Sequence, residues 1–443
     1  MDTTAVPISD VPPSDVHLTH PEWSRSASIY QVNTRQLTAE GTLAAAAGHL
    51  PRIKDLGATI VWLMPVHEIG VRNRKGSLGS PYAVRDYLSV SAELGTVDDL
   101  RAFVDRAHEL GLRVILDWVA NHTAWDNPLV GEHPEWYARD WKGDLQPSPW
   151  WDWDDIIDLD FSRPELREYM TAAMAYWVRE VGVDGFRCDV AGFVPTDFWV
   201  DTRAVLEEIK PVFLLAEWES RELHDRAFDM TYGWTWHEAM HHIAHGSADV
   251  GALRSYYAWN EKAYPADCYR MLFVSNHDKN AWDGTDRELF GDALEATTVL
   301  SVVSEGMPLV HNGQEAGGER RLAFFERDPI EWVEHPIGDL VRRLLALKTA
   351  NQALWNGRWG GRMVEVVTDR RDEVIAFVRR RGDHAVTAVL NLSAAPQRVT
   401  LVDGPVAGTW TDLETGATTT LGLGVALDLG PWGYRVLVQG PTT

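Results

Sequence analysis

The chain has 443 residues, 45% of them hydrophobic and 24% charged, which is the composition of a soluble globular protein. This length accommodates a large catalytic domain with a smaller appendage. The formal net charge of −24 argues against nucleic acids and anionic membrane surfaces as partners, because both require Lys and Arg. The 21 tryptophans are compatible with sugar stacking and equally with core packing.

The cysteine count and the first residues of the chain indicate a cellular compartment. Cys188 and Cys268 are too few for a disulfide scaffold. Up to about His20, the chain carries acidic and proline residues instead of a basic segment followed by an apolar one. No apolar run reaches the roughly 18 residues of a membrane span. We therefore expect a cytoplasmic protein without a signal peptide.

Short apolar runs alternate with amphipathic stretches along most of the chain. The runs are rich in β-branched or aromatic residues, which is typical of buried parallel strands. They lie at 28–32, 58–63, 112–116, 183–188, 212–216, 271–274 and 308–310, with a weaker eighth candidate at 227–231. Helical patterns lie between them, most clearly at 97–110, 165–181 and 288–304.

This alternation predicts an α/β fold in which helices cover a parallel sheet. Eight strands predict a (β/α)8 TIM barrel, which needs about 250 residues or more. An open doubly wound sheet is the alternative, but no Gly-x-Gly-x-x-Gly motif follows the first strand. We assign residues 1–120 and 164–355 to a catalytic barrel.

Two segments depart from the alternation. Residues 121–163 are rich in Trp, Asp and Pro and are too long for an ordinary connection, so we expect a short inserted domain after the third strand. Its Trp-Asp cluster at 150–155 suits either a sugar platform or the small core of the insertion. Residues 356–443 contain closely spaced strands with turn signals, which predict a C-terminal antiparallel β domain, a β-sandwich.

Four polar clusters coincide with the ends of predicted strands, at 117–122, 185–189, 216–218 and 275–278. Barrel enzymes place their active sites at the carboxyl ends of the strands. A charged residue at the end of a buried strand is costly unless it is paired. One cluster alone is compatible with a buried ion pair, whereas four on one rim predict an active site.

Three carboxylates in these clusters suit the cleavage of a glycosidic bond, which needs one carboxyl group as acid and another as nucleophile or base. Arg187 precedes Asp189 by two residues and shares its face of the strand, so we expect the guanidinium to keep Asp189 ionised as a nucleophile. Glu217 ends an apolar strand, where desolvation favours an acid/base role. Asp278 is then expected to stabilise positive charge on the sugar in the transition state.

The four clusters resemble the signature segments of the α-amylase family of glycoside hydrolases. Further segments resemble that family in the same order, at 57–65, 80–82, 85–87, 158–160 and 306–315. The resemblance extends from about residue 30 to residue 318. The C-terminal part resembles the family's third domain only in its pattern of closely spaced strands. It implies a retaining mechanism with Asp189 as nucleophile, Glu217 as general acid/base and Asp278 as transition-state stabiliser.

The resemblance also implies the surroundings of the substrate. Arg187, His122 and His277 would line the pocket around the sugar under attack, and Tyr82 would stack beneath that sugar. Asn121 and Asp158 fall where the family often holds a structural Ca²⁺, a cation that prefers oxygen ligands. No organic cofactor is expected.

Three departures from the family pattern bear on substrate choice. Gly192 and Phe193 occupy positions where many members have Lys-His, which serves the leaving-group side of the cleft. Val190 follows the proposed nucleophile, and in this family Val there often accompanies tolerance of α-1,6 linkages. The insertion is short, which suggests a shallow or uncommon cleft.

The sequence thus predicts a glycosidase that hydrolyses α-1,4 and also α-1,6 glucosidic bonds in malto-oligosaccharides, cyclic or branched α-glucans. Two alternatives stay open: a transglycosylase of the same fold, and a non-catalytic sugar-binding or scaffold barrel. The second is disfavoured because all three carboxylates are present. The expected partner is an oligosaccharide substrate, and we expect no binding to nucleic acids or membranes. The sequence leaves open whether the protein forms a homodimer.

Overall fold

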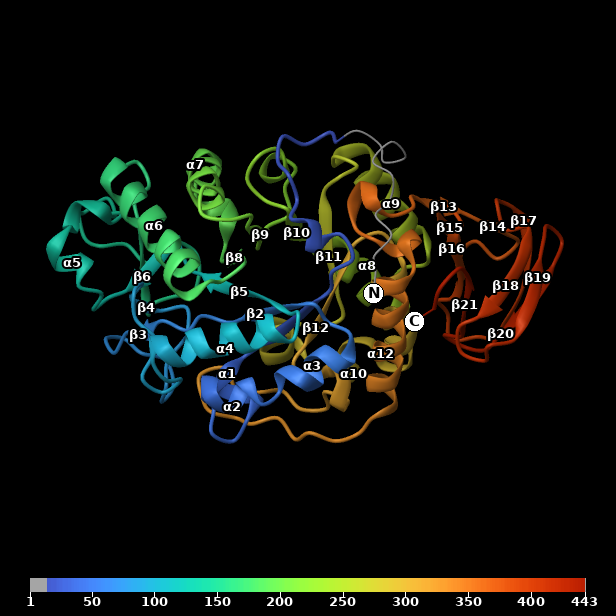
Figure 1. Cartoon of the computed structure of the whole chain (residues 1–443), viewed down its shortest axis with the longest axis horizontal. Coiled ribbons are helices and arrows are strands. Elements are labelled where there is room, and N and C mark those ends of the chain that lie inside the picture. Colours follow the sequence, from blue (N-terminus) through green and yellow to red (C-terminus); the bar gives the residue numbers. More distant parts are fainter. Residues whose placement is uncertain (1–13, 443) are drawn as a thin grey trace.

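The computed structural model describes residues 14–442, so the first 13 residues of the segment assigned to the barrel lie outside the described part. Eight parallel strands close into a barrel (Figure 1), which confirms the predicted TIM barrel. In barrel order they are β1 (Ile29–Val32), β2 (Ile60–Leu63), β5 (Arg113–Trp118), β8 (Gly185–Cys188), β9 (Phe213–Ala216), β10 (Met230–Tyr232), β11 (Tyr269–Phe273) and β12 (Met307–His311). The weak eighth candidate corresponds to β10.

The strands are buried on both faces because their side chains alternate between two apolar cores. Ile29, Ile60 and Ile115 point into the barrel, where they pack with aromatic and Met side chains from the other strands. Their neighbours Tyr30 and Val61 point outward and pack under the helices. This double burial explains why the strands appear in the sequence as continuous apolar runs.

Helices surround the barrel: α1 (Thr34–Leu37), α2 (Leu43–Ala47), α3 (Leu50–Leu56), α4 (Val97–Glu109), α6 (Pro164–Tyr176), α7 (Thr196–Glu207), α8 (Trp234–Ala244), α9 (Gly251–Ala263), α10 (Asp286–Phe290), α11 (Leu294–Val303) and α12 (Pro336–Ala350). A capping box formed by Thr96 and Asp99 starts α4, where a helix was predicted. The predicted helix 288–304 is instead two helices, α10 and α11. The helix is interrupted at Gly291, because its φ of +52° lies in the left-handed region and ends α10.

The inserted segment forms a small lobe at one end of the molecule, opposite the C-terminal strands (Figure 1). Its strands β6 (His122–Ala124) and β7 (Ile156–Asp158) pair antiparallel and flank α5 (Leu129–Glu132). Next to it, β3 (Glu68–Ile69) pairs with β4 (Val84–Asp86) in the connection after β2. Trp150 and Trp151 are 103% and 56% exposed, so the interpretation of their cluster as a small core is wrong for these two rings.

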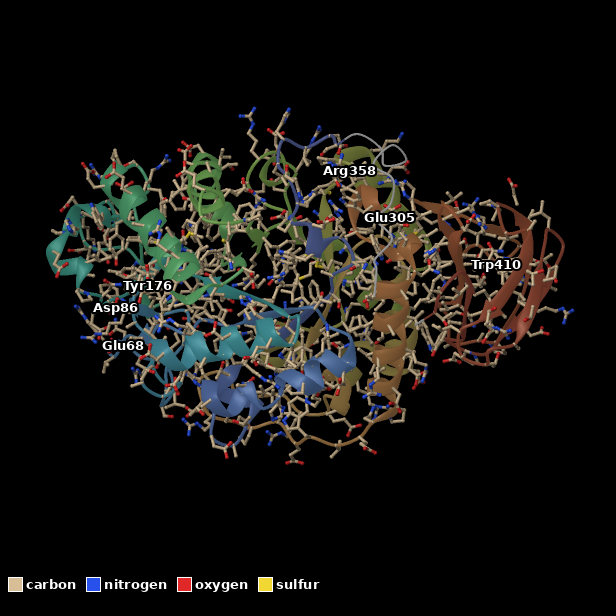
Figure 2. All side chains as sticks on the ribbon, viewed as in Figure 1. Glu68, Asp86, Tyr176, Glu305, Arg358 and Trp410 are labelled. Atoms are coloured by element: carbon tan, nitrogen blue, oxygen red, sulfur yellow. The ribbon has the colours of Figure 1, made fainter. Side chains whose placement is uncertain are left out.

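Two antiparallel sheets form the C-terminal part. One has six strands in the order β13 (Met363–Glu365), β15 (Val374–Arg381), β16 (His384–Asn391), β21 (Tyr434–Gln439), β18 (Gly408–Asp412) and β19 (Thr418–Leu421). The other contains β14 (Val367–Thr368), β17 (Gln397–Asp403) and β20 (Ala426–Leu429). Trp410 is buried with apolar side chains of both sheets (Figure 2). The sequence did not indicate β18, β19 and β20, because their outward positions are Thr, Gly and Asp and no apolar run marks them.

Candidate active site

The carboxyl ends of three barrel strands bring the three predicted carboxylates together. Asp189 follows β8, Glu217 follows β9 and Asp278 lies in the turn after β11. All three line one cavity of about 520 Å³. Tyr82, His122 and His277, predicted to contact the sugar, line the same cavity. Arg187 lies in β8 and is fully buried.

Arg187 contacts three carboxylates at once. Its Nη1 lies 2.8 Å from Asp117 Oδ1 and 3.0 Å from Asp189 Oδ1, and its Nη2 lies 2.8 Å from Glu217 Oε1. Its Nε donates a hydrogen bond of 3.2 Å to the Tyr232 hydroxyl. Burial acts to lower the pKa of Arg187, but Asp117 and Glu217 outweigh it and raise that pKa well above its usual value. The guanidinium is therefore a permanent positive charge beneath the cavity.

One guanidinium does not compensate the charges of the three carboxylates. Burial and the adjacent Glu217 carboxylate raise the pKa of Asp189 well above its usual range, although Arg187 acts in the opposite direction. Burial likewise raises the pKa of Asp117 to about 6, against the effect of Arg187. Arg187 thus favours the ionised form of Asp189, as expected from the sequence, but its charge is shared with Asp117 and Glu217, which the sequence did not reveal.

Glu217 has a polar contact on each carboxylate oxygen. Arg187 contacts Oε1, and the backbone N–H of Val190 donates to Oε2 at 2.8 Å. Val190 has a φ of +36°, a left-handed conformation that is rare for a β-branched residue and costs about 1–3 kcal/mol. The turn after Asp189 thus stores backbone strain, and in that conformation its amide points at the proposed acid/base.

Tyr82 and His277 are joined in a hydrogen-bonded chain on the opposite side of the cavity. The Tyr82 hydroxyl donates to Asp117 Oδ2 at 3.0 Å and lies 2.8 Å from His277 Nε2. Gln31 Nε2 lies 2.7 Å from His277 Nδ1, so Nδ1 is the acceptor and the ring carries its proton on Nε2. Burial lowers the pKa of His277 to about 3, so the ring is neutral. His277 Nε2 also lies 3.2 Å from Asp278 Oδ2.

His122 completes the group around Asp189. Its Nε2 lies 3.9 Å from Asp189 Oδ2, and its ring centre lies 6.1 Å from that of Trp153. Burial lowers the pKa of His122 to about 4. Both histidines are therefore neutral near pH 7. A neutral imidazole has one donor and one acceptor nitrogen, so it can form hydrogen bonds with sugar hydroxyls.

Comparison with known proteins agrees with this geometry. A model of the "Alpha amylase, catalytic domain" family matches residues 21–251, more than half of the chain. The structure of the maltogenic α-amylase AmyB from Thermotoga neapolitana is similar, with a TM-score of 0.85 and 31% identity over 94% of this chain and 99% of that one. The chain belongs to the α-amylase family. The α-amylase of Lactobacillus plantarum is similar to the same degree, with 31% identity, a TM-score of 0.84 and the same shares covered.

The curated α-amylase-family relatives are longer than this chain. Alpha-amylase MalA of Haloarcula japonica is 27% identical over 413 residues, which are 89% of this chain. The chain spans only 59% of the length of MalA.

Several side chains of this α-amylase-family cavity were not predicted. Lys75, Asp152 and Trp153 line it from one side, and Trp282 and Phe324 from another. Trp153 belongs to the Trp-Asp cluster, for which the sugar-platform interpretation is now favoured at this ring. Asp152 belongs to the same cluster. Lys75 and Phe324 lie in connecting loops and Trp282 in the short helix Lys279–Asp283, and only the folded chain brings these three to the cavity.

The predicted calcium ligands fit a cation poorly. Asp158 Oδ1 already accepts hydrogen bonds from the Ser148 hydroxyl at 2.5 Å and the Asn121 side-chain amide at 3.3 Å. Ca²⁺ takes about six to eight oxygen ligands, usually with several carboxylates. Within residues 14–442, no group of three or more His, Cys, Asp or Glu side chains is placed to hold a metal. The Ca²⁺ site at Asn121 and Asp158 therefore stays a prediction, and no catalytic step is assigned to it.

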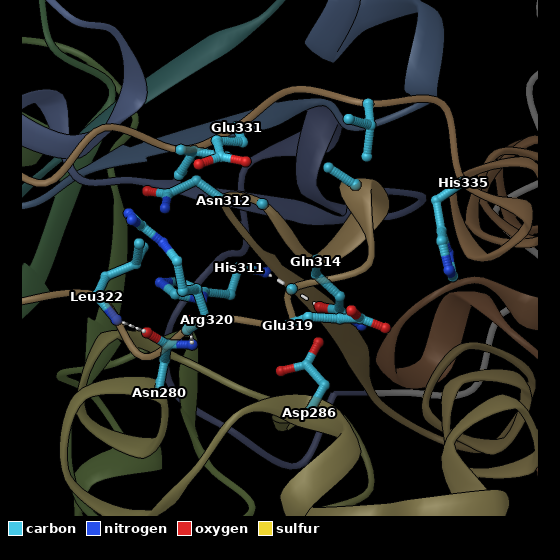
Figure 3. Close-up of a pocket in the computed structure, with 15 residues that line it drawn as sticks. Asn280, Asp286, His311, Asn312, Gln314, Glu319, Arg320, Leu322, Glu331 and His335 are labelled. Carbon is cyan, nitrogen blue, oxygen red and sulfur yellow. Dashed lines mark hydrogen bonds between the residues drawn. The ribbon is translucent and has the colours of Figure 1, made fainter.

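Figure 3 shows a second cavity, which has a volume of about 320 Å³. Its lining includes Glu319, Arg320 and Leu322, and Leu322 lies two residues before Phe324 of the catalytic cavity. Asp286 lies at its base, and burial raises the pKa of Asp286 to about 7. In the part of the chain that the structure covers, no helix is long and apolar enough to cross a membrane.

Proposed function

We propose that this chain is a retaining glycosidase that hydrolyses α-1,4 and also α-1,6 glucosidic bonds in malto-oligosaccharides and related cyclic or branched α-glucans. The observation that carries the proposal is the placement of Asp189, Glu217 and Asp278 on one cavity above the shared Arg187. Double displacement needs a nucleophilic carboxylate and a separate acid/base carboxyl group, and the cavity offers both.

In the first step, a carboxylate oxygen of Asp189 attacks the anomeric carbon. The bond to the leaving oxygen breaks, its electron pair stays on that oxygen, and Glu217 supplies the proton. In the second step, Glu217 takes a proton from water, the water oxygen bonds to the anomeric carbon, and Asp189 leaves. Arg187 and the Val190 amide stabilise the Glu217 carboxylate between the two steps, because the guanidinium forms an ion pair with Oε1 and the amide donates a hydrogen bond to Oε2.

The rest of the cavity suits a neutral sugar in an oxocarbenium-like transition state. Asp278 presents a partly exposed carboxylate, which stabilises the positive charge that develops on the ring. Tyr82 offers an aromatic face to the apolar face of the sugar. The neutral His122 and His277 offer hydrogen bonds to its hydroxyls.

The relatives support this substrate class. AmyB of Thermotoga neapolitana is named maltogenic, and a cyclomaltodextrinase from a Bacillus species is 25% identical over 83% of this chain. Neopullulanase 2 of Thermoactinomyces vulgaris is 25% identical over 90% of it. These names support maltose-containing and cyclic or branched glucans as the substrates to test first.

Transfer to another sugar is the second candidate. The maltosyltransferase of Rhodospirillum rubrum, which uses maltose 1-phosphate, is 29% identical over 84% of this chain. Next to Glu217, the exposed Phe193 and the partly buried Trp218 form an apolar pair whose ring centres are 5.1 Å apart, a surface suited to an acceptor sugar. Incubation with maltotriose separates the candidates, because only transfer produces chains longer than the substrate.

The test of the proposed function is Glu217→Gln on maltotriose. Loss of general acid assistance should lower kcat by about 10² to 10⁴. Glu222→Gln is the matched control, since Glu222 lies in the same loop but is bonded only to Ser220 at the surface. Asp189→Asn should be at least as damaging as Glu217→Gln. Unimpaired hydrolysis by Glu217→Gln contradicts the assignment.

We also propose the cytoplasm as the location, which the unpaired Cys188 and Cys268 support. A homodimer stays a proposal that sedimentation at several protein concentrations would test.

A further inference from the structure

Three loops are tied together across one side of the catalytic cavity. They comprise residues 73–78 after β2, 152–155 in the insertion after β5, and 324–326 after β12, and we call them the loop belt. At the first joint, Lys75 Nζ lies 3.2 Å from Asp154 Oδ1 and 3.4 Å from Asp155 Oδ1, and it donates to the Asp152 carbonyl at 2.5 Å. The belt therefore connects the insertion to the loop after β2.

The second joint connects the loop after β2 to the loop after β12. The Ser77 backbone N–H donates to Glu326 Oε1 at 2.8 Å, and the Ser77 hydroxyl donates to the same carboxylate. The Leu78 N–H donates to the Phe325 carbonyl at 3.2 Å. A Cβ added at Gly76 would lie 2.5 Å from the Phe325 Cβ, so the two loops are in close contact here.

The third part of the belt is anchored to the segment that carries Asp278. The Asn280 side chain accepts a hydrogen bond from the Leu322 N–H at 2.9 Å and donates one to the Arg320 carbonyl at 3.0 Å (Figure 3). Two residues beyond Leu322, the Phe324 ring lies 5.4 Å from that of Trp282. Phe324 is thereby held against the cavity.

The belt covers one half of the barrel rim. β12, β1, β2 and β5 are consecutive in the barrel, and the loops of the belt leave from β12, β2 and β5. Asp189 and Glu217 follow β8 and β9 on the other half. That half carries the 42% exposed Phe193. One end of the cavity is thus walled and the other is open.

The direction of the substrate follows from the chemistry. The leaving oxygen has to lie beside Glu217, which protonates it, so the leaving group extends over the open half near Phe193 and Trp218. The glycosyl unit that is transferred to Asp189 extends the other way, toward the belt. In an α-glucan, that direction leads to the non-reducing end.

We propose that the loop belt closes the glycosyl end of the cavity, so that the protein cleaves linear α-glucans from a free non-reducing end. This inference rests on the proposed hydrolase function and narrows its substrate class. The cavity of about 520 Å³ has the size of a small-ligand pocket, so its walled end holds a short glycosyl unit, and we expect maltose as the product. Lys75 is a specificity-determining residue, because its side chain holds the first joint and lines the cavity.

The experiment compares three substrates at equal concentration: maltopentaose, maltopentaose whose terminal non-reducing ring carries a 4,6-ethylidene acetal, and a cyclic maltoheptaose. A reducing-end label on both linear substrates identifies the first cut. We expect maltose as the first product of maltopentaose. The blocked chain should be cleaved about 10- to 200-fold more slowly than unblocked maltopentaose, because a closed pocket discriminates to this extent against an added small group. The ring, which has no chain end, should also be cut more slowly than maltopentaose.

The matched variants are Lys75→Met and Lys142→Met. Met keeps much of the apolar stem of Lys but cannot form the ion pairs to Asp154 and Asp155. Lys142 lies on the exposed surface of the same insertion, over the Trp141 ring. Lys75→Met should bring the rate on the blocked chain to within about 10-fold of the rate on maltopentaose, whereas Lys142→Met should leave the ratio unchanged.

The outcomes separate the two proposals. Equal rates of the wild-type protein on blocked and free maltopentaose, or first cuts in the chain interior, would overturn the closed end. An unchanged ratio in Lys75→Met, with a thermal unfolding curve like that of the wild type, would overturn the role of Lys75. Absence of any cleavage or transfer with all three substrates would instead overturn the proposed function.

Discussion

A Cβ atom added at Gly192 would lie 2.1 Å from Cε2 of Trp218, far inside van der Waals contact. Trp218 directly follows Glu217, and Gly192 is the third residue after Asp189. Their contact joins the two backbone segments that carry the proposed acid/base and nucleophile. The Phe193 ring meets the same indole at an interplanar angle of 61°. The missing side chain at Gly192 therefore allows Trp218 to pack beside Glu217.

Gly192→Ala should displace the Trp218 indole and with it the Glu217 segment. We expect kcat/KM on maltotriose to fall by about 10- to 100-fold, because small displacements of a catalytic group are costly. The free energy of unfolding should fall by about 1–3 kcal/mol from the overpacked contact. Gly131→Ala is the control, since a Cβ there meets nothing within 4 Å. Equal activity of the two variants contradicts a positioning contact.

Arg187→Lys should impair both folding and catalysis. An ammonium cannot contact Asp117, Asp189 and Glu217 together as the planar guanidinium does. Loss of a partner from a buried ion-pair group costs about 3–5 kcal/mol in stability. We expect kcat to fall by about 10² to 10³, comparable to the loss of one preorganised donor. Urea unfolding and steady-state kinetics measure the two effects, and a variant with wild-type kcat would refute the shared role.

Asp286→Asn should stabilise the protein at alkaline pH. Burial raises the pKa of Asp286 to about 7, above the usual unfolded value of about 3.9. Between these values the folded state keeps a proton that the unfolded state has lost, so wild-type stability falls as pH rises through this window. Each unit of pKa difference corresponds to about 1.4 kcal/mol. Urea unfolding at pH 5 and pH 8 checks this, and the prediction fails if the stability advantage of Asp286→Asn does not increase between them.

Calcium should have little effect on stability. Asp158 Oδ1 is already hydrogen-bonded to Ser148 and Asn121, and burial raises the pKa of this carboxyl group. We expect the Tm in 1 mM EDTA and in 5 mM CaCl₂ to agree within about 1 °C, because only a ligand that binds the folded state raises Tm. A calcium-dependent rise in Tm that Asp158→Asn abolishes would establish the site at Asn121 and Asp158.

The elements that could be predicted are those whose signal is local. Each barrel strand is a short run buried on both faces, so its apolar character is visible without its neighbours. The ends of those runs carry Asp189, Glu217 and Asp278, and parallel closure alone places such ends on one rim. The start of α4 is equally local, because Thr96 and Asp99 cap it within one turn.

Only the tertiary structure shows which charged residues and which loops come into contact when they are distant in the sequence. Arg187 contacts Asp117, 70 residues away, and Glu217 as well as Asp189, so its charge is shared among three carboxylates. Burial and the neighbouring Glu217 raise the pKa of Asp189, and Arg187 opposes them. The loop belt joins Ser77 to Glu326, 249 residues apart, and no periodic pattern marks either. Local patterns report the burial of each segment, whereas pKa values and cavity walls depend on which segments meet. The carboxylates could therefore be predicted from the sequence, whereas the shape of the cavity around them could not.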